Sequence, residues 1–276
     1  MYIRWSSSSR RKNVIRLVAL NVDGTLLDSQ GRLSAANTAA IVQAKSKGVK
    51  IVLATARQPR PASWLIQELG LTTPLICHNG AVGYRPEDGV ELWHLRLDLS
   101  CAREIAAYAD EHGFELSITV DGLTYYRQRP GQTPGPLDES HYVLASNLEA
   151  VTRPPTRIIA HGAEAATAIW CEFRPRLWAR VRFDRYYREG MLYSLTMVSA
   201  RASKGAALAR LCREWKIAPE SVLAIGDSEA DLEMFAYAGL SVAVGNAPPV
   251  VQAAADAVAP SNDEDGVAWA IEKFVL

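Results

Sequence analysis

The residues best suited to chemistry in this chain follow a short apolar segment near its N-terminus. Residues 15–20 read Ile-Arg-Leu-Val-Ala-Leu, and residues 21–25 read Asn-Val-Asp-Gly-Thr. An apolar run that ends abruptly in polar side chains and a glycine is typical of a buried parallel strand reaching the edge of its sheet. Ligands bind beyond the carboxyl ends of such strands, so residues 21–25 are a candidate binding or catalytic segment.

Polar side chains follow other predicted strands in the same way. The further strand ends are marked by Thr55-Ala56-Arg57, His78-Asn79-Gly80 and Gly226-Asp227, with a second carboxylate at Asp231. Lys204 would stand in the first turn of a helix over residues 204–215. Groups of these kinds suit phosphoryl transfer, which requires an in-line nucleophile, neutralisation of the phosphate oxygens and protonation of the leaving oxygen.

Each segment has a plainer interpretation when it is taken alone. Asp-Gly-Thr can be a turn, Thr55 and His78 can be structural strand-end residues, and Lys204 can be a solvated helical residue. Asp227 and Asp231 can be an N-cap and a first-turn acid favoured by the helix dipole. The chemical interpretation therefore depends on their occurrence together and in order.

In that order the segments resemble the four motifs of the haloacid dehalogenase-like (HAD) phosphatases. Residues 21–25 stand at motif I, Thr55 at motif II, Lys204 at motif III and residues 226–231 at motif IV. Residues 244–247 and 262–267 also resemble the Cof-type branch of that family, which carries a large α/β (type IIB) cap. The resemblance extends from about residue 14 to the end, with a cap-sized insertion between motifs II and III.

The resemblance implies an aspartyl-phosphate mechanism that depends on Mg²⁺. It implies catalytic roles for Asn21, Asp23, Thr55 and Lys204, with Asp23 as the general acid. It implies substrate-binding roles, through backbone amides or side chains, for Val22, Gly24, Ala56, Arg57 and Asn246. It implies that Mg²⁺ is held by Asn21, Asp23 (through its backbone carbonyl), Asp227 and Asp231.

Position 21 departs from the family pattern, because Asn21 stands where the family places its aspartate nucleophile. An amide is neutral, its nitrogen lone pair is delocalised, and it removes one negative charge from the metal site. Three explanations stay open: a natural silent relative, an engineered substrate trap, or low activity by another route in which Asp23 activates water. Ala230, where the motif often has asparagine, is a milder departure.

We therefore expect a Mg²⁺-dependent phosphatase-type hydrolase of small phosphorylated metabolites, of the sugar-phosphate class, with activity reduced or abolished by Asn21. The alternative is a non-catalytic protein that binds a phosphorylated ligand on the same scaffold. A phosphomutase is a less favoured third reading. The sequence does not identify the substrate or the oligomeric state.

The predicted fold is α/β, with a doubly wound, parallel-sheet, Rossmann-like core and an inserted α+β cap. The core comprises residues 13–83 and 194–276, the cap residues 84–193, and a frayed leader residues 1–12. Ser34 is a predicted helix N-cap, Gly48 a helix C′ residue, and Ser100 the cap of a helix over residues 101–112. Asp121-Gly122 predicts a hairpin turn.

Composition excludes several other classes of function. The 276 residues contain 30 basic and 30 acidic side chains, which gives no support for a nucleic-acid or anionic-membrane partner. No apolar run approaches the ~18 residues of a membrane span, and no secretory signal is visible, so we expect a cytoplasmic protein. The four scattered cysteines predict free thiols. Six arginines of the cap, at 174, 176, 180, 182, 185 and 188, predict a largely solvated face.

Overall fold

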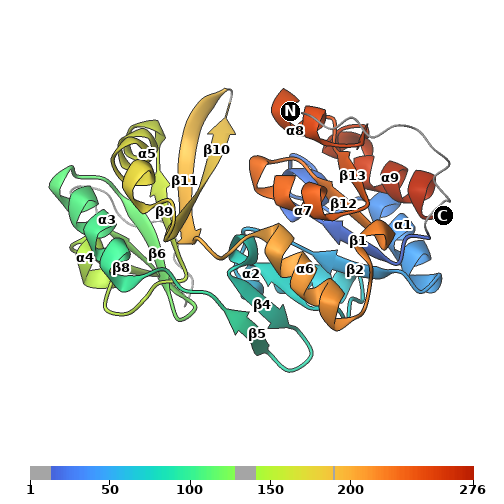
Figure 1. Cartoon of the computed structure of the whole chain (residues 1–276), viewed down its shortest axis with the longest axis horizontal. Coiled ribbons are helices and arrows are strands. Elements are labelled where there is room, and N and C mark those ends of the chain that lie inside the picture. Colours follow the sequence, from blue (N-terminus) through green and yellow to red (C-terminus); the bar gives the residue numbers. More distant parts are fainter. Residues whose placement is uncertain (1–13, 128–140, 189) are drawn as a thin grey trace.

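The computed structural model describes residues 14–127, 141–188 and 190–276, so the predicted leader lies outside the described residues. The described chain forms two lobes joined by two connections, at residues 95–98 and 200–203 (Figure 1). One lobe is built from both ends of the chain and the other from its middle. No helix within the described ranges is long and apolar enough to cross a membrane.

A parallel sheet forms the centre of the first lobe, the core. Its strands, in the order β14-β13-β12-β1-β2, are Ala257–Val258, Leu240–Ala243, Val222–Gly226, Leu17–Leu20 and Lys50–Leu53. Alternate side chains of each strand point to opposite faces, and both faces are buried. Helices α1 (Ala35–Ser46), α2 (Pro59–Glu68) and α9 (Gly266–Phe274) pack on one face. Helices α6 (Lys204–Glu214), α7 (Leu232–Tyr237) and α8 (Pro249–Ala254) pack on the other. The predicted doubly wound core is confirmed.

Local signals in the first βαβ unit act as expected. The Ser34 side chain accepts a hydrogen bond from the backbone of Asn37 and caps α1. Gly48 follows the helix with φ of +80°, a conformation that favours glycine. These two residues set the length of the helix between β1 and β2.

A small antiparallel sheet extends the core toward the second lobe. It consists of β3 (Leu75–Cys77), β4 (Val82–Arg85) and β5 (Val90–His94). A bridge between Ala54 and Ile76 attaches β3 to the edge of the parallel sheet. The predicted boundary at residue 84 therefore falls inside β4, and by strand pairing the core continues to His94.

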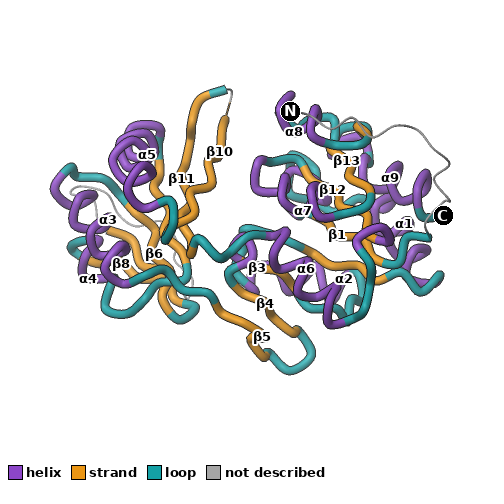
Figure 2. The backbone as a smooth tube through the Cα atoms, in the orientation of Figure 1, coloured by secondary structure: helices purple, strands orange, loops and turns teal. Residues whose placement is uncertain are grey.

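The second lobe is the α+β cap. Its sheet has the order β10-β11-β9-β6-β7-β8, with strands Val181–Arg188, Met191–Ser199, Arg157–His161, Leu116–Val120, Leu123–Arg127 and His141–Leu144. Helices α3 (Leu99–Glu111), α4 (Asn147–Ala150) and α5 (Ala163–Leu177) lie on the side away from the core (Figure 2). Asp121 and Gly122 both have positive φ, as the hairpin turn requires. Since β11 runs to Ser199, the predicted boundary at 193 also falls inside a strand.

The cap sheet has one apolar and one polar face. Leu116, Ile118 and Val120 point into the helix-covered cap interior, whereas the intervening Ser117 and Thr119 point to the opposite face. That second face is turned toward the core. A hydrogen bond of 2.7 Å from Gln58 of the core to Thr124 of the cap crosses the interface.

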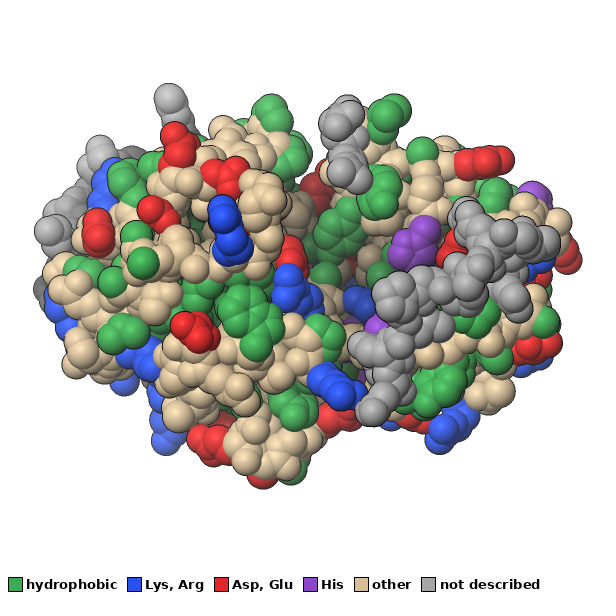
Figure 3. Space-filling view, turned by 180° about the vertical axis from the view of Figure 1, so that it is seen from behind, with side chains coloured by type: hydrophobic (Ala, Val, Ile, Leu, Met, Phe, Trp, Pro, Cys, Tyr) green, Lys and Arg blue, Asp and Glu red, His purple; other side chains and the backbone are tan. Residues whose placement is uncertain are grey.

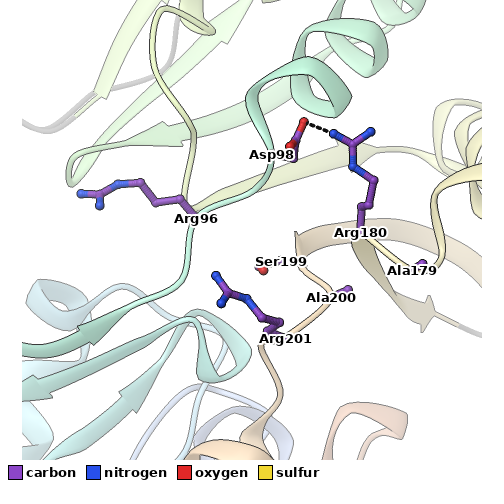
Figure 4. Close-up of a pocket in the computed structure, with 7 residues that line it drawn as sticks. All are labelled: Arg96, Asp98, Ala179, Arg180, Ser199, Ala200 and Arg201. Carbon is purple, nitrogen blue, oxygen red and sulfur yellow. Dashed lines mark ion pairs between the residues drawn. The ribbon is translucent and has the colours of Figure 1, made fainter.

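The two connections border a pocket of about 270 Å³ (Figure 4). It is lined by Arg96, Asp98, Ala179, Arg180, Ser199, Ala200 and Arg201. Asp98 rather than Ser100 is the N-cap of α3, because its carboxylate accepts the backbone N–H groups of Ser100 and Cys101. An ion pair of 2.5 Å with Arg180 holds the pKa of Asp98 well below its usual value. The N-cap residue Asp98 thus also links α3 to Arg180, directly before β10.

Candidate active site

The ends of three neighbouring strands bring the predicted residues together. In β1, Leu20 lies beside Ile225 of β12 on one side and Leu53 of β2 on the other. The residues that follow these strands therefore meet at one edge of the sheet. Asn21, Thr55 and Lys204 are buried there, with exposed fractions of 5%, 0% and 2%, and Asp227 lies against them.

A tight turn over Val22–Leu26 shapes the first of these strand ends. Gly24 has φ of +75°, and a Cβ placed there would lie 2.6 Å from Oδ2 of Asp227. The Thr25 hydroxyl donates a 2.7 Å hydrogen bond to Oδ1 of the same carboxylate. Glycine is therefore required both by the backbone conformation and by the close approach of Asp227.

The Asn21 amide is held at both ends. Its Oδ1 accepts a hydrogen bond from Nζ of Lys204 at 2.9 Å. Its Nδ2 donates to the backbone carbonyl of Asp23 at 2.9 Å and to Oδ1 of Asp227 at 2.5 Å. An ammonium group has donors only, so the amide oxygen must face Lys204. The amide nitrogen is then directed at Asp23 and Asp227, two of the predicted metal-binding residues.

Lys204 and Asp231 form a buried ion pair of 2.7 Å, with exposed side-chain fractions of 2% and 0%. The second oxygen of Asp231 accepts three hydrogen bonds, from the backbone of Asp227 and from the backbone and hydroxyl of Ser228. Asp231 therefore neutralises Lys204 and fixes the loop that carries Asp227. Burial, followed by the negative charge of Asp231, raises the pKa of Asp227 to about 6.

The predicted magnesium ligands do not fit a metal ion as they are arranged. The oxygen of Asn21 is used by Lys204, and both oxygens of Asp231 are used by the protein. The Asn21 amide nitrogen lies on the carbonyl of Asp23 and on Asp227. Among the described residues, no group of three or more His, Cys, Asp or Glu side chains converges as a metal site. An amide cannot offer one oxygen to Lys204 and a second to a metal ion, whereas a carboxylate can.

The other predicted residues lie around this centre. Asp23 is half-exposed and forms a 2.6 Å ion pair with Arg57. The backbone N–H of Arg57 donates to the Thr55 hydroxyl oxygen at 3.0 Å, which fixes the loop after β2. Val22 and Ala56 place their backbones at the two strand ends. The carbonyl of Ala56 accepts a hydrogen bond from the cap.

Asn246, predicted to bind substrate, is engaged within the protein. Its Nδ2 donates to the carbonyl of Gly24 at 2.8 Å, and its Oδ1 accepts from the backbone of Asn262 at 3.0 Å. In this arrangement Asn246 supports the turn over Val22–Leu26 and ties it to the C-terminal segment.

Sequence reasoning did not single out a second cluster, at the contact between the lobes. Nδ2 of Asn79 donates to Asp184 at 2.8 Å and to the Tyr186 hydroxyl at 2.9 Å, so the loop after β3 is fastened to β10 of the cap. Arg157 of β9 donates to Ala56 at 2.5 Å. The alternation of β9 and β10 could have placed these side chains on a common face, but only the tertiary structure shows that this face meets the core.

The surface is hollowed between the two lobes, and Lys and Arg side chains lie at the edge of the hollow (Figure 3). Two cap arginines predicted to be solvated instead reach the core, where Arg182 pairs with Glu233 and Arg185 with Glu229. The site thus lies between a buried, charge-balanced core edge and a polar cap face.

Comparisons with known proteins agree with this architecture. Residues 18–271 match the haloacid dehalogenase-like hydrolase family. Phosphatase YwpJ of Bacillus subtilis is 30% identical over 286 residues, covering 92% of this chain and 98% of that protein. The 5-amino-6-(5-phospho-D-ribitylamino)uracil phosphatase YcsE of B. subtilis is also 30% identical over 286 residues, covering 98% and 100%. The solved structure of a haloacid dehalogenase-like hydrolase from B. subtilis superposes with a TM-score of 0.80 at 26% identity, covering 94% and 99%.

The chain therefore belongs to the haloacid dehalogenase-like hydrolases. Within that family it is a Cof-type hydrolase, with phosphatases among its relatives and a large α/β cap.

Proposed function

We propose that this chain binds small phosphorylated metabolites, of the sugar-phosphate class, in a phosphatase-type site whose hydrolytic activity is reduced or abolished by Asn21. The observation that carries the proposal is the assembled set of Lys204, Asp231, Asp227 and Thr55 around an amide. The relative YcsE, named for a phosphoribitylamino substrate, is consistent with this ligand class.

Different residues would provide the charge, the hydrogen-bond donors and the proton donor that act on a bound phosphoryl group. Lys204 supplies a buried positive charge, and backbone N–H groups near Val22 and Ala56 supply donors for the phosphate oxygens. Asp23, when its ion pair with Arg57 opens, is the proton donor for the leaving oxygen. What is absent is a nucleophile in line with the leaving group, because the amide of Asn21 cannot attack phosphorus.

An aspartate at position 21 would supply both the nucleophile and an oxygen for Mg²⁺. One carboxylate oxygen could keep the contact with Lys204 while the other faced Asp23 and Asp227. Mg²⁺ bound there would neutralise phosphate oxygens. We therefore propose that metal dependence belongs to the aspartate form of the site.

A second candidate is a non-catalytic, ligand-binding protein on the same scaffold. The saturated hydrogen bonding of Asn21 favours it, since the amide is well accommodated where it stands. The two candidates differ in whether the remaining machinery can complete a reaction. A phosphomutase would interconvert isomers with little release of free phosphate.

The test is phosphate release from p-nitrophenyl phosphate with Mg²⁺ by the native chain, Asn21→Asp and Asn21→Ala. We expect Asn21→Asp to exceed both others by roughly 10³- to 10⁶-fold, the scale of nucleophile removal in other enzymes. Asn21→Ala is the matched control, because it removes the amide without adding a carboxylate. Full activity of the native chain would refute the role given to Asn21. An inactive Asn21→Asp variant that still binds phosphate esters would favour the non-catalytic candidate.

A further inference from the structure

Arg157 differs from the other arginines that reach across the lobe contact. Arg182 pairs with Asp184 and Glu233, and Arg185 pairs with Glu229 at 3.3 Å. Arg157 makes no ion pair within the described part of the chain. Among the described residues, its one hydrogen bond runs from Nη1 to the carbonyl of Ala56. A guanidinium carries five N–H donors, and the Nε of Arg157 is buried without a hydrogen-bond partner.

The position of Arg157 follows from the alternation of β9. Ile158 and Ala160 point into the cap interior, so Arg157 points to the face that meets the core. Burial lowers the pKa of Arg157, and no carboxylate is among the groups that oppose this shift. A buried charge without a partner is costly, which makes an unpaired arginine here a feature that needs an explanation.

Unsatisfied polar atoms cluster around this side chain. In the described residues, four buried side-chain nitrogen or oxygen atoms lack a hydrogen-bond partner, and three of them are Nε of Arg157, Oδ1 of Asn79 and Nδ1 of His78. Native proteins leave few such atoms. His78 and Asn79 also have φ of +50° and +53°, a conformation uncommon for residues other than glycine. His78 and Asn79 are buried, whereas Arg157 is half-buried as a residue, although its Nε is buried.

This cluster adjoins the phosphoryl site without being part of it. The backbone of His78 donates to the carbonyl of Arg57, and that of Asn79 to the carbonyl of Thr55. Arg157 contacts Ala56, the residue between those two. A group bound by Arg157 would therefore lie on the cap side of the loop whose backbone we expect to bind the phosphoryl group.

We propose that Arg157 binds a second anionic group, a carboxylate or a second phosphate, on the ligand whose phosphoryl group occupies the Lys204 site. This inference rests on the proposed function and narrows its ligand class to phosphate monoesters with a second negative charge. Planar guanidinium groups bind carboxylate and phosphate through paired, charge-assisted hydrogen bonds. The second anionic group of such a ligand would pair with Arg157, for which the described residues provide no carboxylate.

The test compares ligands that differ only in the second group. We would titrate the native chain calorimetrically with ethyl phosphate, phosphoglycolate, O-phosphoethanolamine and ethylene glycol bisphosphate, and repeat the series with Arg157→Gln, Arg157→Lys and Arg185→Gln. Hydrogen bonds to charged groups contribute about 1.5–3 kcal/mol. We therefore expect phosphoglycolate or the bisphosphate to bind roughly 10- to 100-fold more tightly than ethyl phosphate, and phosphoethanolamine to bind no better than ethyl phosphate.

The variants separate anion recognition from a purely structural role. Arg157→Gln should lose the preference and leave ethyl phosphate affinity unchanged. Arg157→Lys should recover part of the preference, and Arg185→Gln should retain all of it. Equal binding of all four ligands by the native chain would overturn the proposal. So would an equal loss for every ligand in Arg157→Gln, which would mean that Arg157 binds the phosphoryl group itself or only docks the cap.

The same series tests the proposed function separately. Binding of ethyl phosphate without any anion preference would overturn the role of Arg157 and leave the proposed function standing. If no phosphate ester binds and Asn21→Asp is also inactive on p-nitrophenyl phosphate, both fail together.

Discussion

Polar groups at the core edge are paired with one another, whereas some polar groups at the contact between the lobes are not. At the core edge, Asn21, Lys204, Asp227 and Asp231 satisfy one another through short hydrogen bonds and one buried ion pair. At the lobe contact, Arg157 has no counter-ion among the described residues, and its Nε, Nδ1 of His78 and Oδ1 of Asn79 are buried without a hydrogen-bond partner. The charges at the core edge are therefore paired without a ligand, whereas the charge of Arg157 at the lobe contact is not.

This difference predicts separate effects on folding stability and on ligand binding. The core edge remains charge-balanced because the amide of Asn21 donates to the oxygens that face it. The cap side carries the positive charge of Arg157, which no carboxylate of the described residues neutralises. Substitutions on the core edge should therefore cost folding stability, whereas substitutions of Arg157 should alter ligand selection.

The largest contrast is expected between Lys204→Met and Arg157→Met. Loss of Lys204 leaves the fully buried carboxylate of Asp231 without its ion pair, which should lower the free energy of unfolding by about 3–5 kcal/mol. Loss of Arg157 leaves no carboxylate stranded, so its effect should be small or stabilising. Urea unfolding followed by circular dichroism measures both. Equal destabilisation by the two variants would remove the contrast between the two sides.

Gly24→Ala should have the next largest effect, and Gly122→Ala is its matched control. Both glycines have positive φ, but an added Cβ meets Asp227 at 2.6 Å in the first case and nothing within 4 Å in the second. Strain alone costs of the order of 1 kcal/mol, and displacement of Asp227 should add to it and weaken phosphate binding. Thermal unfolding and a phosphate titration test the pair. If Gly24→Ala behaves like Gly122→Ala in both, the tight packing of motif I against Asp227 is refuted.

The smallest effect concerns the exposed pair of Asp98 and Arg180. Asp98→Ala removes the N-cap of α3 and should cost about 1 kcal/mol near neutral pH, with little added by an exposed ion pair. The pKa of Asp98 is lower in the folded protein than in the unfolded chain. Its contribution is therefore present above the unfolded pKa, near 4, and is lost as the pH falls toward the folded value. Unfolding of native and variant chains at pH 7 and pH 3 should show the difference shrinking; a difference that grew would reverse the assigned shift.

Local sequence signals predicted the core well because they act over a few residues. Ser34 and Gly48 bound the first helix, and the apolar runs before Asn21 and Thr55 are buried strands as expected. The prediction that Ser100 caps α3 was wrong, because the Asp98 carboxylate accepts the backbone N–H groups of Ser100 and Cys101 and so provides the N-cap.

The candidate site was predictable to the extent that strand ends converge on one edge. The resemblance placed Lys204 and Asp227 beside Asn21, and the geometry brings them within hydrogen-bonding distance. Asn246 hydrogen-bonds to Gly24, and Arg157 hydrogen-bonds to Ala56. Both contacts join residues that lie far apart in the chain. No pattern of spacing reveals such contacts, since they arise only when the lobes are packed together.

The most direct test of the account is a calorimetric titration of the native chain and of Asn21→Asp with Mg²⁺. We predict that Asn21→Asp binds Mg²⁺ saturably, whereas the native chain shows no saturable heat at the same concentrations, because its amide holds the carbonyl of Asp23 and the carboxylate of Asp227. Equal affinity of the two proteins for Mg²⁺ would contradict the claim that the residue at position 21 closes the metal site.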